Sequence, residues 1–122
     1  MARPTIGHLD PVFVDMMEEM KVLLRYAFRT ENQLTMPVSA PGSTGMETCF
    51  VNLVEPGDDV VVCVNGVFGT RMADIVNRIG GNLIRVDAEW GTAIDPDAVQ
   101  SAIEGKKPKL IAVVHAETST GV

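Results

Sequence analysis

The sequence lacks the features that would assign it to a membrane or to nucleic acid. No apolar run approaches the roughly 20 residues of a membrane span, and the start, Met1-Ala2-Arg3-Pro4, has no hydrophobic signal region. Basic residues never cluster beyond Lys106-Lys107, and the formal net charge is -6. We therefore expect that neither a membrane nor a nucleic acid is a partner of this protein.

Cysteine is scarce as well. Cys49 and Cys63 lack the spacing of metal ligands, and two cysteines do not resemble the disulfide framework of a secreted domain. We expect buried free thiols in a reducing compartment, and so a cytoplasmic location. His115 and Glu117 have no third ligand beside them, so we expect no metal site.

Three glycine-containing signatures of catalytic and nucleotide sites are also missing. There is no Gly-x-Gly-x-x-Gly for a dinucleotide, no Gly-Lys-Ser/Thr for a nucleoside triphosphate, and no Gly-x-Ser-x-Gly for a serine nucleophile. A nicotinamide dehydrogenase, a triphosphate hydrolase and a serine hydrolase are therefore disfavoured.

The chain has the length and the composition of one ordinary globular domain. It has 122 residues, of which 46% are hydrophobic and 21% are charged. Asp10-Pro11 is typical of a helix start, and apolar residues recur after it at intervals of three and four. This stripe predicts a helix with one apolar face, suited to a core or a subunit interface: Phe13, Met16, Met17, Met20, Leu23, Leu24, Ala27 and Phe28.

Beyond residue 33, strand and helix patterns alternate. The unbroken β-branched run in Asp59–Val64 indicates a strand buried on both faces, as in a parallel sheet covered by helices. We predict an α/β fold with a mostly parallel sheet and flanking helices, in which residues 1–33 form a lead-in and an interface helix and residues 34–122 form the core. The predicted strands are 34–38, 59–64, 83–86 and 109–115, and the predicted helices are 46–53, 70–79 and 95–105.

Three turns of small and polar residues follow predicted strands, at 39–45, 65–69 and 117–121. In open α/β sheets, ligands bind beyond the carboxyl ends of the strands. The first turn opens a helix, whose free N–H groups can hold a phosphate; the second carries an aromatic ring, Phe68; the third carries hydroxyls. From residue types alone, turns with nothing bound, a core role for Phe68 and hydroxyls that only cap a helix remain open alternatives.

The combination of motifs is more specific than its parts. In order and spacing, five segments resemble the class V aminotransferases, which use pyridoxal 5′-phosphate, and within them the serine–glyoxylate and alanine–glyoxylate enzymes. The resemblance covers essentially the whole chain and implies part of the large domain of a fold-type-I transferase. Its segments are Arg-Pro-x-Ile-Gly-His-Leu-Asp-Pro at 3–11, Ser-Ala-Pro-Gly-Ser-x-Gly-Met-Glu at 39–47, Asn-Leu-Val-Glu-Pro-Gly-Asp at 52–58, Asn-Gly-Val-Phe-Gly at 65–69 and His-Ala-Glu-Thr-Ser-Thr-Gly at 115–121.

The resemblance implies a role for particular residues. The cofactor phosphate would lie on Gly42, Ser43 and Thr44. Phe68 would stack on the pyridine ring, where family members often have Trp, and Thr118 would lie near the ring and its phenolic oxygen. The chain differs from some family members at three positions of the phosphate turn, which implies that backbone N–H groups contribute more than side chains there: Ala40 and Pro41, where some members have Gly and Ser, and Ser43, where some have His.

The resemblance also shows what this chain does not contain. Family members carry an Asp for the pyridine nitrogen, the Schiff-base lysine and an Arg for the substrate carboxylate after the last of these motifs. We therefore expect no catalytic residue in this chain, an incomplete cofactor domain, and no transamination by residues 1–122 alone. The complete enzyme, by resemblance a homodimer, would move an amino group from serine or alanine to glyoxylate, with an amino acid and a 2-oxo acid as substrates. The competing hypothesis is a non-catalytic α/β module that binds a phosphorylated small molecule or a partner chain.

Overall fold

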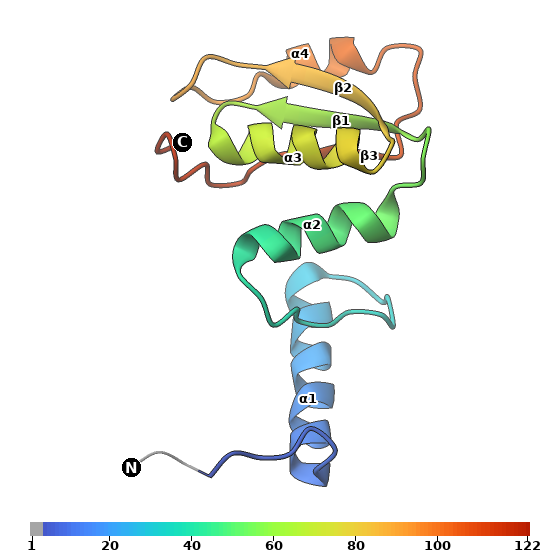
Figure 1. The fold of residues 1–122 in the computed structure, drawn as a ribbon, viewed down its shortest axis with the longest axis vertical. Coiled ribbons are helices and arrows are strands. Elements are labelled where there is room, and N and C mark those ends of the chain that lie inside the picture. The colour runs from blue at the N-terminus through green and yellow to red at the C-terminus, as the bar shows by residue number, and fades with distance from the viewer. Residues whose placement is uncertain (1–3) are drawn as a thin grey trace. The chain divides into compact units, whose positions relative to one another are not determined.

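The computed structural model describes residues 4–122; residues 1–3, the first part of the predicted lead-in, lie outside the described residues. The chain divides into two compact units, Met1–Ser39 and Ala40–Val122. Figure 1 shows the elements in chain order. They are α1 (Pro11–Phe28), α2 (Gly42–Leu53), β1 (Asp59–Val64), α3 (Val67–Arg78), β2 (Asn82–Asp87), α4 (Pro96–Ala102) and β3 (Leu110–Ala112).

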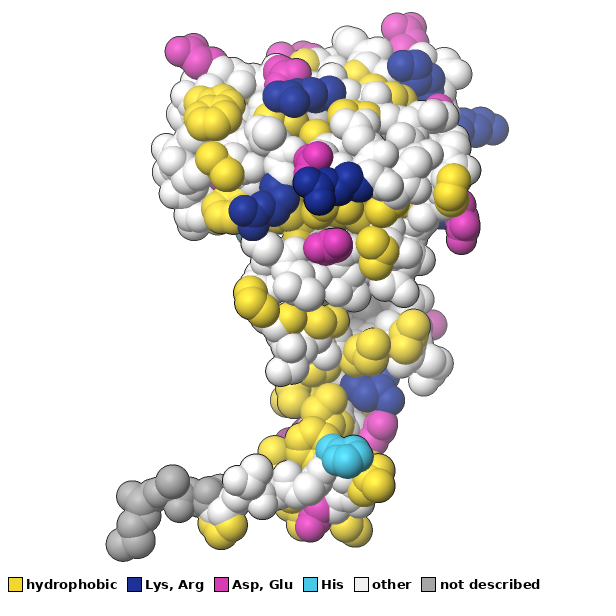
Figure 2. Space-filling view, viewed as in Figure 1, with side chains coloured by type: hydrophobic (Ala, Val, Ile, Leu, Met, Phe, Trp, Pro, Cys, Tyr) yellow, Lys and Arg dark blue, Asp and Glu magenta, His cyan; other side chains and the backbone are white. Residues whose placement is uncertain are grey.

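The first unit is built on α1, which begins where the sequence predicts. The Asp10 side chain accepts a hydrogen bond from the backbone N–H of Val12 at 2.9 Å, and Pro11 occupies the first turn, where its missing N–H costs nothing. No residue of α1 is buried among the described residues, and Leu23 is 58% exposed. Figure 2 shows hydrophobic side chains at the surface of this unit. The apolar stripe therefore lacks a core of its own.

The second unit is a parallel three-stranded sheet with the strand order β2-β1-β3. The central strand β1 is covered on both faces, which confirms the prediction from its β-branched run. Val60, Val62 and Val64 pack in one cluster with residues of α2 and α3. Val61 and Cys63 pack on the opposite face with Val86 and with residues of α4. Figure 1 accordingly shows α3 and α4 on opposite sides of the sheet. The predicted α/β class with a parallel sheet and flanking helices is correct.

Several element boundaries differ from the sequence predictions. Residues 34–38 form no strand, because no described strand forms a ladder with them and Pro37 lacks an N–H donor for such a ladder. The last strand covers only Leu110–Ala112. Two helices start earlier than expected, since α2 takes in Gly42–Gly45 and α3 takes in Val67–Gly69. Two of the predicted turns are therefore the first turns of helices.

Candidate functional site

The start of α3 is held by a carboxylate from the far end of the chain. Glu117 is fully buried, and its Oε2 accepts hydrogen bonds from the backbone N–H groups of Phe68 and Gly69, each at 3.1 Å. Its Oε1 accepts a hydrogen bond from the Ser119 hydroxyl at 2.5 Å. The Ser119 oxygen in turn accepts the N–H of Val67 at 3.0 Å. The turn at 117–120 thus caps a helix, α3, that precedes it in the chain.

The charge state of Glu117 follows from this environment. Burial raises the pKa of a carboxyl group, but the hydrogen bonds from the Ser119 hydroxyl and from the amides of Gly69, Phe68 and Ser119 outweigh it and hold the pKa of Glu117 below its ordinary value. The carboxylate is therefore ionised at neutral pH. A negative charge at this place also complements the positive end of the α3 dipole.

Two glycines make room for this arrangement. A Cβ on Gly66 would lie 2.5 Å from the Glu117 Cδ and 2.7 Å from the Ser119 Oγ. A Cβ on Gly69 would lie 2.8 Å from the Cys63 carbonyl oxygen and 2.9 Å from the Val64 Cα. Any larger residue at either position would displace the carboxylate or push α3 away from β1. The glycines of Asn-Gly-Val-Phe-Gly are therefore needed for close approach.

The start of α2 is organised differently. No side chain of residues 4–122 caps it, and the Pro41 carbonyl accepts the N–H groups of Thr44 and Gly45 at 2.9 and 3.2 Å. A Cβ on Gly42 would meet nothing within 4 Å, so the backbone at the first residue of the helix is open. The N-terminus of α2 thus offers N–H groups without a side-chain acceptor, while that of α3 is already occupied by Glu117.

Arg71 joins the start of α2 to the aromatic ring on α3. Its guanidinium donates a hydrogen bond to the Ser43 hydroxyl and lies 5.7 Å from the centre of the Phe68 ring. A cation at that distance is attracted by the face of the ring. Ser43 and Phe68, which come from different predicted turns, are therefore bridged by one positive side chain.

The donor set at α2 fits an anionic group such as a phosphate. It combines backbone N–H groups at a helix N-terminus, the hydroxyls of Ser43 and Thr44, and the guanidinium of Arg71. A phosphorylated cofactor with a flat ring would also find the aromatic side chain of Phe68 beside the guanidinium. The types of residue present, namely hydrogen-bond donors, a cation and an aromatic ring, therefore fit the phosphate and the ring of pyridoxal phosphate.

The five residues predicted to bind the cofactor lie on elements that are linked to one another. Gly42, Ser43 and Thr44 form the first turn of α2, and Phe68 lies in the first turn of α3. Thr118 is exposed and stands between Glu117 and Ser119, both of which bond to the start of α3. Arg71 and the Glu117 turn therefore connect all three segments, while the binding roles of the five residues stay predictions.

Glu117 and Arg71 belong to the site although neither was predicted from the sequence to be part of it. An acidic residue directly after a buried strand, in a turn otherwise made of small and hydroxyl residues, was the available signal for Glu117. The signal for Arg71 was its spacing, because a residue three positions after Phe68 lies on the same side of a helix. Neither signal reveals the partner, which comes from a distant part of the chain.

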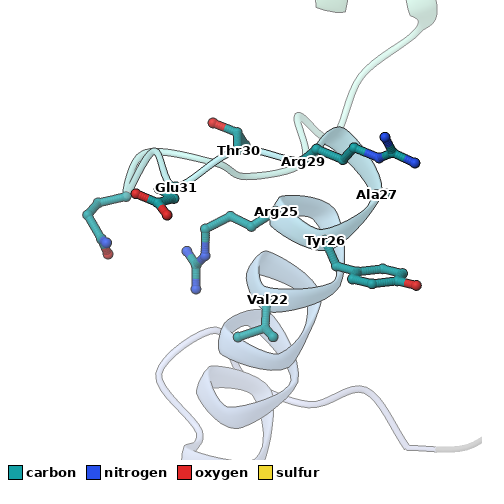
Figure 3. A pocket seen from close by; sticks show the side chains of 8 residues that line it. Val22, Arg25, Tyr26, Ala27, Arg29, Thr30 and Glu31 are labelled. Carbon is teal, nitrogen blue, oxygen red and sulfur yellow. The ribbon is translucent and has the colours of Figure 1, made fainter.

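The cavities do not single out these residues. A pocket of about 290 Å³ between α2 and α3 includes Ser43 and Arg71, and none of the other four predicted cofactor residues lines it. In the first unit, a hollow of about 940 Å³ lies at the end of α1. Figure 3 shows that Arg25 and Glu31 extend to one side of the helix while Tyr26 and Arg29 extend to the other. Because the lining side chains do not converge, this hollow does not form a binding site.

Two general findings concern membranes and metals. Within residues 4–122, no helix combines the length and the apolar character that crossing a membrane requires. Across the same residues, no three side chains of His, Cys, Asp or Glu gather closely enough to hold a metal ion.

Comparisons with known proteins give consistent results. No protein-family model matches the chain. It is 38% identical over 121 residues to a (S)-ureidoglycine–glyoxylate transaminase of Bacillus subtilis, covering 99% of this chain and 29% of that protein. It is 35% identical over 122 residues to an alanine–glyoxylate aminotransferase of Drosophila melanogaster, covering 100% of this chain and 31% of that protein. Among solved structures, an alanine–glyoxylate aminotransferase from Nostoc matches with 42% identity and a TM-score of 0.87, over 97% of this chain and 31% of that one. The chain thus spans about 30% of the length of the relatives it matches.

Proposed function

We propose that the complete protein is a pyridoxal-phosphate-dependent aminotransferase, because the homologues of this chain are alanine–glyoxylate and ureidoglycine–glyoxylate aminotransferases. It would transfer an amino group to glyoxylate, with serine or alanine as donor, and residues 1–122 would form the amino-terminal part of its cofactor domain. The observation that carries this proposal is the similarity in both sequence and fold over nearly the whole chain. These relatives are named for glyoxylate but for different amino acids, ureidoglycine and alanine. They therefore support glyoxylate as the amino acceptor more than they support any one amino donor.

Each residue of the candidate site then has a role in binding or orientation. The phosphate would lie at the start of α2, on its backbone N–H groups and on the hydroxyls of Ser43 and Thr44, with Gly42 leaving room for approach. Phe68 would stack on the ring, and Thr118 would contact its phenolic oxygen. When bound, pyridoxal phosphate supplies an electron-withdrawing ring that stabilises negative charge on the amino acid. The chain's own part is to hold and orient that ring.

The lysines of this chain support the proposal that it does not transaminate alone. The Lys109 N–H donates to the Asp59 carbonyl at 2.7 Å, where β1 begins, so Lys109 lies at the amino end of the sheet. Lys106 and Lys107 precede it in the chain. None of these three lysines stands at the carboxyl ends of the strands, where the start of α3 and the Thr118 turn lie. Lys21 belongs to α1, in the other unit.

The test uses purified residues 1–122 and two probes. Pyridoxine 5′-phosphate, which has no aldehyde and cannot react with surface lysines, reports reversible binding through its fluorescence. We expect Phe68→Ala to weaken binding about tenfold, since stacking is worth roughly 1 kcal/mol or more, while Val67→Ala at the exposed neighbour leaves it unchanged. Equal affinities for the two variants, or no binding by the unsubstituted chain, would contradict the assignment of this site.

The second arm of the test asks about catalysis. Residues 1–122 are incubated with pyridoxal 5′-phosphate, treated with borohydride and analysed by mass spectrometry, in parallel with an assay for amino transfer from alanine or serine to glyoxylate. We expect no turnover and no single preferred lysine. Stoichiometric labelling of one lysine together with turnover would show that the chain is active by itself.

Two further features of the complete protein are part of this proposal. The exposed apolar stripe of α1 supports a homodimer in which a second copy covers it, as expected from the resemblance. Cys49 and Cys63 are both free thiols; Cys63 is buried as expected, but Cys49 is exposed, so the expectation of two buried thiols is wrong for Cys49. Free thiols favour a reducing compartment and so a cytoplasmic location.

A further inference from the structure

We propose that Glu117 is a positioning residue for the cofactor ring, because its carboxylate fixes the start of α3 in the orientation that presents Phe68. This inference rests on the proposed function, since it concerns the same site. It assigns to Glu117 no contact with the cofactor itself.

The hydrogen bonds hold three consecutive amides. The N–H groups of Val67, Phe68 and Gly69 are bound by the Ser119 oxygen and by Glu117 Oε2, at 3.0, 3.1 and 3.1 Å. The first N–H groups of a helix have no intrahelical partner, so their direction is set by whatever accepts them. With the amides on both sides of the Phe68 Cα held, the direction of its Cα–Cβ bond is fixed, and with it the place from which the ring projects.

The same carboxylate ties this helix start to the turn that carries Thr118. Its Oε1 accepts the Ser119 hydroxyl at 2.5 Å, and Thr118 lies between Glu117 and Ser119 in the chain. Both neighbours of Thr118 are therefore anchored to the amides of 67–69. Phe68 and Thr118, proposed to contact the face and the phenolic oxygen of the ring, are kept at a set distance by one buried charge.

A neutral side chain of the same size cannot do this. In Glu117→Gln, one amide oxygen replaces two carboxylate oxygens, and the NH₂ group faces the donors of 67–69 or of Ser119. Either the amides of Phe68 and Gly69 or the two donors of Ser119 then lose their acceptor. In both cases the remaining hydrogen bonds go to a neutral oxygen, which holds them more weakly than a carboxylate does. The helix start is expected to sample several orientations, and the Phe68 ring moves with it.

The experiment compares Glu117→Gln and Ser119→Ala with Val99→Ala in purified residues 1–122. Val99 packs on the opposite face of the sheet, so its truncation lowers the melting temperature without touching the start of α3. Two quantities are measured at pH 7: hydrogen exchange of the amides at 67–69, followed by NMR, and the affinity for pyridoxine 5′-phosphate. Amides elsewhere in α3 report any general loss of stability.

We expect exchange at 68 and 69 to speed up by about tenfold more than at other α3 amides in Glu117→Gln, and affinity for the probe to fall about tenfold. Ser119→Ala, which keeps the carboxylate, should show a smaller effect on both, and Val99→Ala should change neither beyond its general destabilisation. Glu117→Asp keeps the charge on a shorter side chain, and we expect it to restore neither the slow exchange at 68 and 69 nor the affinity for the probe.

The outcomes separate this inference from the proposed function. If the unsubstituted chain binds the probe and Glu117→Gln matches Val99→Ala in both measurements, Glu117 has no positioning role and the inference falls while the cofactor site stands. If no variant binds the probe but Glu117→Gln loses protection at 68 and 69, the cofactor function falls and the ordering of the α3 start by Glu117 stands. Should Glu117→Gln fail to fold, Ser119→Ala decides, and unchanged exchange and affinity in it would overturn the inference.

Discussion

Glu117 is buried with its charge, which a protein tolerates only where hydrogen bonds replace the lost water. Three backbone amides and one hydroxyl supply that replacement. Two of these amides, those of Phe68 and Gly69, belong to the first turn of α3 and have no acceptor within the helix. The same hydrogen bonds therefore stabilise the buried carboxylate and cap α3. At the scale of single residues, the candidate site therefore depends on one side chain that bridges two turns.

The lowered pKa of Glu117 predicts how its contribution to stability varies with pH. The unfolded chain, with an ordinary pKa near 4.5, binds a proton in acid before the folded chain does. The stabilisation by Glu117 is thus complete above that value and is lost as the pH falls through the lower pKa of the folded state. We expect the difference in unfolding free energy between the unsubstituted chain and Glu117→Gln to be constant from about pH 7 to about pH 5.5 and to shrink below about pH 4.

Urea denaturation across this pH range measures the difference. Glu89→Gln is the matched control, because Glu89 is exposed and its side chain accepts no hydrogen bond within the described residues. If the difference in unfolding free energy grew toward low pH, the folded protein would bind the proton on Glu117 more readily than the unfolded chain, and the lowered pKa would be contradicted.

At the scale of elements, the site depends on how closely α3 follows β1. Only Asn65 and Gly66 separate the two, and Asn65 is itself fixed by donating through its side-chain amide to the Thr92 carbonyl at 2.9 Å. Gly69 then rests against the backbone of residues 63 and 64. The first turn of α3 is therefore fixed by two sets of contacts, its packing against the backbone of β1 and its hydrogen bonds to the Glu117 turn.

Gly69→Ala tests this packing. The added methyl would meet backbone atoms, which cannot rotate away, so we expect a loss of about 2 kcal/mol in unfolding free energy and weaker binding of pyridoxine 5′-phosphate. Gly42→Ala is the control for the substitution itself, since a Cβ there meets nothing within 4 Å, and it should change the unfolding free energy by less than about 0.5 kcal/mol. Similar losses in both variants would indicate an effect of backbone freedom and not of close approach.

At the scale of the molecule, each unit leaves apolar surface uncovered. Beside β3, hollows of about 470 and 400 Å³ lie on the two faces of the sheet, and both are lined by Ile111 and Val113. In the other unit, no residue of α1 is buried within the described part of the chain. Uncovered apolar surface of this kind favours association with other chains.

We predict that residues 1–122 self-associate through the apolar stripe of α1 in a concentration-dependent manner. Met20→Glu places a charge on this stripe and should shift the equilibrium toward monomer by about tenfold. Val22→Glu adds the same charge two residues later, about 200° around the helix, and should leave the equilibrium unchanged. Light scattering coupled to size exclusion distinguishes the two, and equal effects of both charges would exclude a defined α1 interface.

The sequence alone determined the elements whose signals are local. The start of α1 at Asp10-Pro11, the start of α4 at Asp95-Pro96 and the buried strand β1 were all predicted, and the two aspartates accept N–H groups at 2.9 Å as N-caps do. Capping and side-chain periodicity involve residues a few positions apart, so they can be read directly from the chain. The α/β class followed from the same alternation.

Only the tertiary structure decided which residues bridge the site. The cap of α3 comes from Glu117, 49 residues after Phe68, and no local pattern specifies a partner at that distance. The predicted strand at 34–38 failed for the complementary reason, because a strand exists only where a neighbour pairs with it. Residue types and spacing fixed the helices and the buried strand. The link from Ser43 through Arg71 to Phe68, and the hydrogen bond from Phe68 to Glu117, depend instead on packing between segments far apart in the chain.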